Sequence, residues 1–481
     1  MSLAIPAADG LLPGAGRVPR LPRDLLVRRR LLDRLHAAVG TGLIVVQAPA
    51  GFGKTTLLAS FIDDGIDFEP LWVTVDPTCR TQEGLAERFA AVALGAHAWP
   101  PLSITFGEDY RSYLAGVLAR WRDCTARPPL VVLDALEELG ADAPAWALVD
   151  WLAEALRDWG ELVLLSREPV ARRALDRRLA AGESLLLGAP DLRFTLDELE
   201  ELCRTRETPC GAPELMEMTG GWPVAVMSIL RGAVPLEGAR RALAGSTWER
   251  YLVAEVWRGV PPVLRPVLLR LSLLPTCDAV AGPALVGDDA WREALCWAEQ
   301  TGLVAESHGD AGLRLLPPFR EFLRREFERT GAEALREAAR QAVAAYLRAG
   351  NAFLALATAT ELRAEAEAVD VLRGHARDLI DRGAFDLLTR AFAVVTPERV
   401  EGDPLLRGLR ARAWSLGGEP RRALEEGRRL AADEDAPPLA RFDGVLAAVR
   451  AARLLGRQRE ALDLLERARE LAPAQVRDTR V

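Results

Sequence analysis

Residues 43–62, LIVVQAPAGFGKTTLLASFI, combine the residue types needed to hold a phosphate group. Gly51 and Gly53 let backbone N–H groups turn toward phosphate oxygens, where a side chain would obstruct the approach. Lys54 adds a compact positive charge, and the hydroxyl of Thr55 is placed to bind Mg²⁺. The segment indicates a phosphate-binding loop in the relaxed form of GxxxxGK[ST], since Ala48 stands at the first glycine position. The residues expected to contact the phosphates are Ala50, Gly51, Phe52, Gly53, Lys54, Thr55 and Thr56.

The distribution of lysine supports this interpretation. Among the 61 lysine and arginine residues of the chain, Lys54 is the single lysine. A compact ammonium fits a space that the planar, five-donor guanidinium of arginine does not fit. The alternative is a strand, a turn and a helix whose sequence matches the motif without binding phosphate. This alternative gives no reason for lysine to occur at this one position.

The surrounding chain predicts a parallel sheet that positions the loop. Short apolar runs alternate with helical stretches, a pattern typical of a parallel sheet covered on both faces. The predicted strands are residues 43–46, 71–75, 130–133, 162–165 and 185–187.

Two of these strands end in residues that could act on a bound phosphate. Asp134 ends the segment PPLVVLD, and Ser166 and Arg167 follow the run ELVLL. Because ligands bind at the carboxyl edge of open parallel sheets, we expect Asp134 to hold Mg²⁺ and Arg167 to sense or stabilise a γ-phosphate. A simple helix cap is the alternative for Asp134. The candidate catalytic residues are Lys54, Asp134 and Arg167, and the candidate metal ligands are Thr55 and Asp134.

Length and composition narrow the classes of protein to consider. The 481 residues predict three or four domains, and 49% hydrophobic residues are sufficient for real cores. A net charge of −8 gives no general attraction to nucleic acid or anionic lipid. Six cysteines without a CxxC pair and four scattered histidines predict no disulfide and no zinc site. No apolar run is long enough to cross a membrane, so we expect a cytoplasmic protein.

Several separated motifs resemble those of one family of regulators. They are APAGFGKTTL, LWVTVD, LVLLSRE, DLRFT and TGGWP, and they occur in this order within residues 18–330. Together they look like the signal-transduction ATPases of the MalT type, also called large ATP-binding LuxR-type regulators, within the STAND class. This resemblance implies a P-loop nucleotide-binding domain, a small helical domain, a winged-helix domain and a helical-repeat sensor.

The resemblance also implies two contacts to the nucleotide, which would be ATP or ADP. An arginine just before the first helix and the proline of a GxP-like segment approach it in the family, and Arg28 and Pro223 stand at the matching positions. From the residues alone, Trp222 and Pro223 also fit an ordinary helix break with a core tryptophan.

The chain departs from the family pattern at two places. The family carries a second acid directly after the strand-terminal aspartate, and this chain has Ala135 there; Glu137 and Glu138 are out of register unless the backbone bulges. A slow ATPase is possible, and whether ATP is hydrolysed stays open. The family histidine before the FREFL segment is replaced by Pro317 and Pro318, so that nucleotide contact is expected to be absent.

The middle of the chain predicts helices and then a winged helix. Thr195 is an expected N-cap, and the segment LVAESHGDAGLRLL has the form of two short strands about a turn. The helix before those strands contains four acidic residues and one arginine, which would repel DNA phosphates. We therefore expect an internal packing module and no direct DNA binding by these residues. The predicted domains are 1–22 (a flexible arm), 23–195, 196–245, 246–330 and 331–481.

From residue 331 onward a helical repeat is predicted. Gly350, Gly383, Gly418 and Gly456 recur at similar separations, as in tetratricopeptide-like hairpins, and we interpret them as positions where two helices approach closely. Stacked hairpins form a curved surface, which predicts binding of an inducer or partner protein. A plain helical scaffold is the alternative.

Three functions are compatible with the sequence. The first is a nucleotide-controlled switch, the core of a transcriptional regulator, in which an inducer on the repeats and ATP favour self-association. The second is a conventional P-loop ATPase, such as a motor or a chaperone-like enzyme. The third is a helical-repeat scaffold that nucleotide stabilises.

Overall fold

The computed structural model describes residues 16–96, 109–170, 173–206, 208, 210–231, 247–306 and 312–471. Contacts divide the chain into two compact units. The first comprises Met1–Pro261, Leu295–Ala305 and Leu315–Phe322, and the second comprises Pro262–Ala294, Glu306–Arg314 and Leu323–Val481. The domain boundaries expected from the sequence stay predictions. Most of the predicted arm, residues 1–15, lies outside the described residues.

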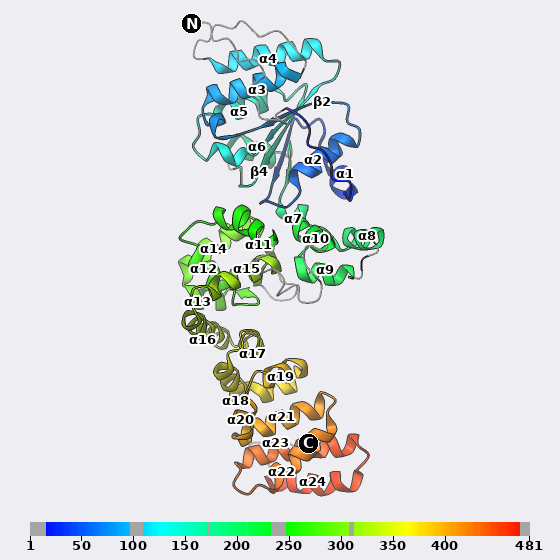
Figure 1. The fold of residues 1–481 in the computed structure, drawn as a ribbon, viewed down its shortest axis with the longest axis vertical. Helices are drawn as coiled ribbons and strands as arrows, with labels where there is room; N and C mark the ends of the chain where they lie inside the picture. Colours follow the sequence, from blue (N-terminus) through cyan, green and yellow to red (C-terminus); the bar gives the residue numbers. More distant parts are fainter. Residues whose placement is uncertain are drawn as a thin grey trace. The chain divides into compact units, whose positions relative to one another are not determined.

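The first unit contains a five-stranded parallel sheet in the order β2-β3-β4-β1-β5 (Figure 1). Each strand coincides with one of the five predicted apolar runs. The strands are β1 (Leu43–Gln47), β2 (Glu69–Thr74), β3 (Pro129–Asp134), β4 (Glu161–Ser166) and β5 (Leu185–Leu187). The position of β4 between β1 and β3 matters for the site, because it places the end of β4 between the phosphate loop and Asp134.

Helices cover both faces of this sheet, as the uninterrupted apolar strands require. Figure 1 shows α3, α4 and α5 together on one side of the sheet and α1 and α2 on the other. These helices are α1 (Arg29–Ala38), α2 (Lys54–Asp63), α3 (Gln82–Ala96), α4 (Tyr110–Cys124) and α5 (Trp146–Ala155). Phe89 of α3, Trp121 of α4 and Leu152 of α5 are fully buried in one core with alternate residues of the strands.

A group of short helices follows β4, and β5 lies between the first and the second of them. They are α6 (Arg173–Ala180), α7 (Ala189–Leu192), α8 (Leu196–Arg206), α9 (Ala212–Thr219), α10 (Pro223–Leu230) and α11 (Thr247–Tyr251). The predicted N-cap at Thr195 is confirmed: its hydroxyl accepts a bond from the N–H of Glu198, and the Glu198 carboxylate accepts one from the N–H of Thr195. After α11 the chain forms a π-helix, η4 (Leu252–Val256), and a short 3₁₀ helix, η5 (Trp257–Gly259).

The next segment has the elements of a winged helix. They are α12 (Arg265–Leu271), β6 (Cys277–Asp278), α13 (Ala281–Val286), α14 (Asp288–Gln300), β7 (Val304–Glu306), β8 (Gly312–Leu315) and α15 (Pro317–Glu328). The two predicted short strands correspond to β7 and β8, and the turn between them lies outside the described residues. The three strands form a small sheet in the order β6-β8-β7.

Helical hairpins make up the rest of the second unit. They are α16 (Ala332–Arg348), α17 (Ala352–Glu361), α18 (Glu365–Asp381), α19 (Phe385–Phe392), α20 (Pro397–Glu401), α21 (Pro404–Leu416), α22 (Pro420–Ala432), α23 (Pro438–Leu454) and α24 (Gln458–Leu471). None of the helices in the described ranges is both long and apolar enough to cross a membrane.

The interpretation of the repeating glycines as sites of close helix approach was wrong. Gly350, Gly383, Gly418 and Gly456 each follow the end of a long helix with φ between 71° and 90°, and an added Cβ would meet at most one atom, at 3.9 Å. They recur because they end helices in the left-handed conformation.

Other glycines make the close approaches between repeat helices. An added Cβ on Gly427 of α22 would lie 2.3 Å from the carbonyl oxygen of Gly444 in α23. One on Gly408 of α21 would lie 2.8 Å from the carbonyl oxygen of Ala440. The backbones of these helices therefore pack directly against one another.

Candidate nucleotide-binding site

The phosphate loop connects β1 to α2 with the geometry that its glycines predict. Gly51 and Gly53 both have φ of 80°, and Gly53 is the N-cap of α2. The side chain of Lys54 crosses the loop, and its Nζ donates to the carbonyl oxygens of Ala48 at 2.5 Å and Pro49 at 3.1 Å. The amine therefore spans the loop between its first and last residues.

Lys54 is a buried cation without a paired carboxylate. The residue is 9% exposed, and no carboxylate in the described ranges forms an ion pair with its ammonium. Burial lowers the pKa of Lys54 to about 8, while the nearby charge of Glu137 opposes that change. An anion placed at the loop would stabilise the charged form, and a phosphate group has both the charge and the size required.

Thr55 and Asp134, the two predicted metal ligands, lie together. The Thr55 hydroxyl donates to Oδ2 of Asp134 over 3.4 Å, and Oδ1 of Asp134 accepts from the N–H of Ala135 at 2.9 Å. Burial raises the pKa of Asp134 above its usual value. The described residues contain no cluster of three or more His, Cys, Asp or Glu side chains that could hold a metal by itself. The pair therefore fits Mg²⁺, which binds through one or two protein oxygens, waters and substrate phosphates.

Arg167 lies at the predicted sheet edge, and its guanidinium is engaged by two carboxylates. Nε of Arg167 is 3.0 Å from Oε1 of Glu137, and Nη1 is 2.6 Å from Oε2 of Glu255. These carboxylates raise the pKa of Arg167 although burial opposes them. Arg167 therefore joins the end of β4 to η4.

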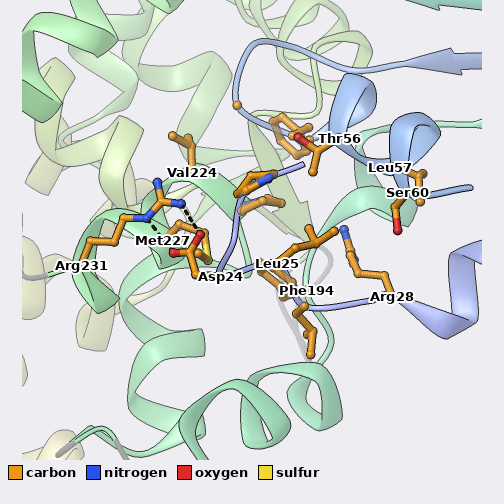
Figure 2. Close-up of a pocket in the computed structure, with 16 residues that line it drawn as sticks. Asp24, Leu25, Arg28, Thr56, Leu57, Ser60, Phe194, Val224, Met227 and Arg231 are labelled. Atoms are coloured by element: carbon orange, nitrogen blue, oxygen red, sulfur yellow. Dashed lines mark hydrogen bonds and ion pairs between the residues drawn. The ribbon is translucent and has the colours of Figure 1, made fainter. Parts of the chain in front are cut away.

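A cavity of about 270 Å³ lies beside the loop (Figure 2). Six of the predicted binding residues line it: Arg28, Gly51, Phe52, Gly53, Thr56 and Pro223. Ala50, Lys54 and Thr55 belong to the loop but not to the wall of this cavity. Pro223 begins α10 after the fully buried Trp222, as the helix-break interpretation expects, and it also lines the cavity. Its contact with a nucleotide stays a prediction.

Arg28 borders the cavity, but most of its N–H groups are already bonded. Its guanidinium donates to the carbonyl oxygens of Leu192 and Arg193 and to the carboxylate of Glu198, and it stacks on the ring of Phe194 at 4.6 Å. Arg28 consequently ties the start of α1 to the residues before α8. This arrangement gives it a positioning role at the wall of the cavity.

The far wall contains residues that the sequence did not reveal. Asp24 and Arg231 line the cavity as an ion pair, shown by dashed lines in Figure 2, with Nη2 of Arg231 3.0 Å from Oδ1 of Asp24. Hydrogen bonding from Arg231 lowers the pKa of Asp24 to about 2. The two residues are far apart in the chain, and neither belongs to a motif.

Val224 and Tyr251 cover the loop at Gly51. The N–H of Val224 donates to the Gly51 carbonyl at 3.0 Å, and a Cβ added to Gly51 would lie 2.3 Å from the Val224 side chain and 2.6 Å from the Tyr251 hydroxyl. Burial raises the pKa of Tyr251 to about 12, so the phenol stays protonated. Both residues bring groups from the helical segments onto the phosphate loop.

A parallel sheet with this loop, followed by helical, winged-helix and repeat segments, defines a multidomain protein of the P-loop NTPase class. Comparison with known proteins is more specific. Residues 253–335 match the MalT winged helix domain. The chain is 26% identical over 442 residues to the HTH-type transcriptional regulator MalT of Klebsiella pneumoniae strain 342, a match that covers 85% of this chain and 47% of the relative. For MalT of Serratia proteamaculans strain 568, identity is 26% over 424 residues, or 83% of this chain and 46% of the relative.

These matches confirm the resemblance to the MalT-type regulators. The chain spans about half the length of the curated relatives it matches. Among solved structures, a STAND protein with a tetratricopeptide repeat sensor from Pyrococcus horikoshii is 16% identical with a TM-score of 0.35, over 96% of this chain and 66% of that one. A likeness at this level says nothing about function.

Proposed function

We propose that this chain is an ATP- and ADP-binding switch of the STAND type and the core of a transcriptional regulator. Its phosphate loop binds the nucleotide, its helical repeats bind an inducer or partner protein, and the nucleotide state controls self-association in the cytoplasm. The observation that carries this proposal is the buried ammonium of Lys54, which spans a phosphate loop beside a cavity of about 270 Å³.

The walls of the cavity suit a nucleoside. Leu25, Phe52, Val224 and Met227 contribute apolar surface, against which a base and a ribose would pack. Gly51 and Gly53 also line the cavity, so phosphates attached to that nucleoside would continue onto the loop. This continuity supports a nucleotide as the ligand over free phosphate.

Mg²⁺ is part of the proposal. When bound, it would neutralise phosphate charge and hold the phosphates in one orientation. Thr55 and Asp134 would hold it, since their oxygens already lie within hydrogen-bonding distance of each other. The chain's own residues would do the rest: the loop N–H groups bind phosphate oxygens and Lys54 supplies a fixed positive charge.

A switch requires that nucleotide and inducer prefer the same conformation. The residues over Gly51 support such coupling, because α10 and the segment containing Tyr251 contact the loop directly. In this proposal ADP favours the resting conformation, and the inducer and ATP together favour the self-associating one. The helical hairpins provide the surface for the inducer.

The test is the nucleotide content of the purified protein. Mass analysis after denaturation should find ADP or ATP in near-stoichiometric amounts with the unchanged chain, and roughly tenfold less with Lys54→Ala, because the phosphates lose their charged partner. Arg29→Ala is the control, since it removes an exposed positive charge from α1, 67% exposed at its side chain. An unchanged nucleotide content in Lys54→Ala would contradict the proposal.

The same preparations separate the other two functions. Sedimentation velocity with ADP, with ATP and with ATP plus an extract containing the inducer should show larger assemblies only in the last case. Steady-state turnover of about 1 s⁻¹ or faster without any inducer would favour a conventional ATPase. A lower melting temperature of Lys54→Ala with unchanged partner binding would favour a scaffold.

A further inference from the structure

The chain after β3 turns in a way that the sequence did not predict. Ala135 has φ of 64° and ψ of 42°, the left-handed conformation, although it is not glycine. A 3₁₀ helix, η3 (Leu136–Leu139), follows, and its Leu136 and Leu139 are buried. This turn moves the next acidic residues relative to the register of an extended strand.

The turn brings Glu137, but not Glu138, to the edge of the sheet. Oε2 of Glu137 accepts from the backbone N–H of Arg167 at 2.9 Å, and Oε1 pairs with its guanidinium. The Glu137 side chain is 13% exposed, and its charge acts on Lys54 and on Asp134. For Glu138, the backbone carbonyl accepts from Arg80. Glu137 is therefore the carboxylate that lies among Lys54, Asp134 and Arg167.

We propose that Glu137 is the carboxylate that orients and deprotonates the water that attacks the γ-phosphate, in place of the acid missing at position 135. This inference rests on the proposed nucleotide function. The water oxygen forms a bond to the γ-phosphorus, and the bond from that phosphorus to the bridging oxygen of ADP breaks. The bridging oxygen takes the electron pair, and Glu137 accepts the water proton and passes it to the phosphate product.

Arg167 controls when Glu137 can act. Its guanidinium pairs with Glu137 and with Glu255 of η4, so one cation neutralises two carboxylates. While the Glu137 pair persists, one oxygen is bonded to the guanidinium and the other to the backbone N–H, so water competes for the remaining half of about four acceptor sites. Transfer of that guanidinium to a phosphate would free the carboxylate. Hydrolysis by this chain is therefore slow until Arg167 changes partners.

The first test compares Glu137→Gln with Glu138→Gln in single-turnover hydrolysis of γ-labelled ATP. Glu137→Gln should be slower by about 100-fold, within the usual contribution of a general base, because an amide cannot accept the proton. Glu138→Gln should match the unchanged chain within about twofold. Both variants should retain ATP as well as the unchanged chain does, which separates a catalytic role from a defect in binding or folding.

The second test locates the Glu137 carboxylate relative to Lys54, and it needs no nucleotide. Lys54 is the single lysine, so acylation of its amine can be followed by mass spectrometry of one peptide as the pH is varied. Burial lowers the pKa of this amine to about 8, and the charge of Glu137 keeps it from falling further. Glu137→Gln should therefore shift the labelling curve to lower pH, and Glu138→Gln should shift it much less.

The outcomes of the two tests decide whether Glu137 is the carboxylate that activates the water. Equal hydrolysis rates for Glu137→Gln and the unchanged chain, or equal shifts of the labelling curve in both variants, would overturn this assignment. So would a chain that retains ATP but never hydrolyses it, although the proposed switch would then survive. A chain that binds no nucleotide at all would overturn the proposed function instead, and the labelling curve would still locate Glu137.

Discussion

The phosphate loop and the helical repeats each bury a charged group, but they treat it differently. Among the described residues, the ammonium of Lys54 donates to backbone carbonyls and to no side chain, and burial lowers its pKa. Asp443 of α23 is fully buried, and its carboxylate accepts from Arg377 of α18 at 2.6 Å and from Arg412 of α21 at 3.1 Å. One charge is left for a ligand to satisfy, and the other is satisfied by the protein itself.

This difference supports the proposed role of the Lys54 ammonium in binding a ligand. A paired buried charge contributes to the fold, whereas an unpaired one costs free energy that a ligand can recover. Several ion pairs of the helical repeats join different helices, as in the contacts of Arg407 with Glu426 and of Arg428 with Glu460. We therefore expect changes in the repeats to alter stability and changes at the loop to alter ligand binding.

The largest effect is expected for Asp443→Ala. This change leaves two arginines without their buried partner, which should lower the free energy of unfolding of the repeats by about 3–5 kcal/mol, as measured by urea denaturation. Asp381→Ala removes a carboxylate that is 71% exposed and 3.5 Å from Arg412, and it should cost less than about 1 kcal/mol. If Asp443→Ala also abolished nucleotide retention, the two regions would not differ as described.

The next largest effect on stability is expected at Gly51, and it can be compared with the effect at Gly456, a glycine of similar φ in the repeats. Gly51→Ala combines left-handed strain with an overlap, because the added Cβ would lie only 2.3 Å from the Val224 side chain, so it should cost about 2–5 kcal/mol and abolish nucleotide retention. Gly456→Ala has the strain without the overlap and should cost about 1–2 kcal/mol with normal retention. Thermal unfolding and nucleotide analysis measure both variants. Equal costs would show that Gly51 is not closely covered.

A smaller change in the free energy of unfolding is expected when the pH is raised. Because burial lowers the pKa of Lys54 to about 8 from 10.5, the folded state loses a proton that the unfolded state keeps between these values. The free energy of unfolding should therefore rise between pH 8 and 10.5.

Binding of ADP should show the opposite trend with pH. The phosphates favour the ammonium, so affinity should fall above pH 8 by up to about tenfold per pH unit, with proton uptake detectable by calorimetry in two buffers. Lys54→Ala is the control, since it has no amine to titrate, and its weaker affinity should not change over this pH range. An affinity that does not depend on pH in the unchanged chain would show that Lys54 is not the group that titrates.

The smallest effect compares two residues other than glycine with positive φ. Ala135 lies at the end of β3, and Arg363, with φ of 53°, lies between α17 and α18. Replacing either residue by glycine relieves left-handed strain but increases the conformational entropy of the unfolded chain. Because these effects oppose each other, each change should alter the free energy of unfolding by less than about 1 kcal/mol. Only Ala135→Gly should alter single-turnover hydrolysis. An effect of Arg363→Gly on hydrolysis would contradict the separation of the two regions.

The sequence predicted those parts of the site that depend on local patterns. The strands β1 to β5, the loop and the pairing of Thr55 with Asp134 all follow from apolar runs and from the topology of parallel sheets. The loop could also be read from its residues because its function depends on backbone geometry that few residue types allow.

The parts that were missed depend on contacts between distant segments or on one unusual dihedral angle. Glu137 reaches the site only because Ala135 is left-handed, a conformation that alanine rarely takes. Asp24 and Arg231 are separated by 207 residues, and nothing local marks them as partners. The repeating glycines were correctly placed but misinterpreted, since a helix end and a close helix contact both favour glycine.

Direct backbone packing around Gly427 and Gly444 has a mechanical consequence for the repeats. Helices separated by a layer of side chains can slide as those side chains change rotamer, but α22 and α23 meet at Gly427 and Gly444 with no such layer. This pair should move as a single stiff block. Any bending of the array in response to the proposed inducer would then occur at other junctions, such as those at Gly350 and Gly383, where the glycines end helices and touch little.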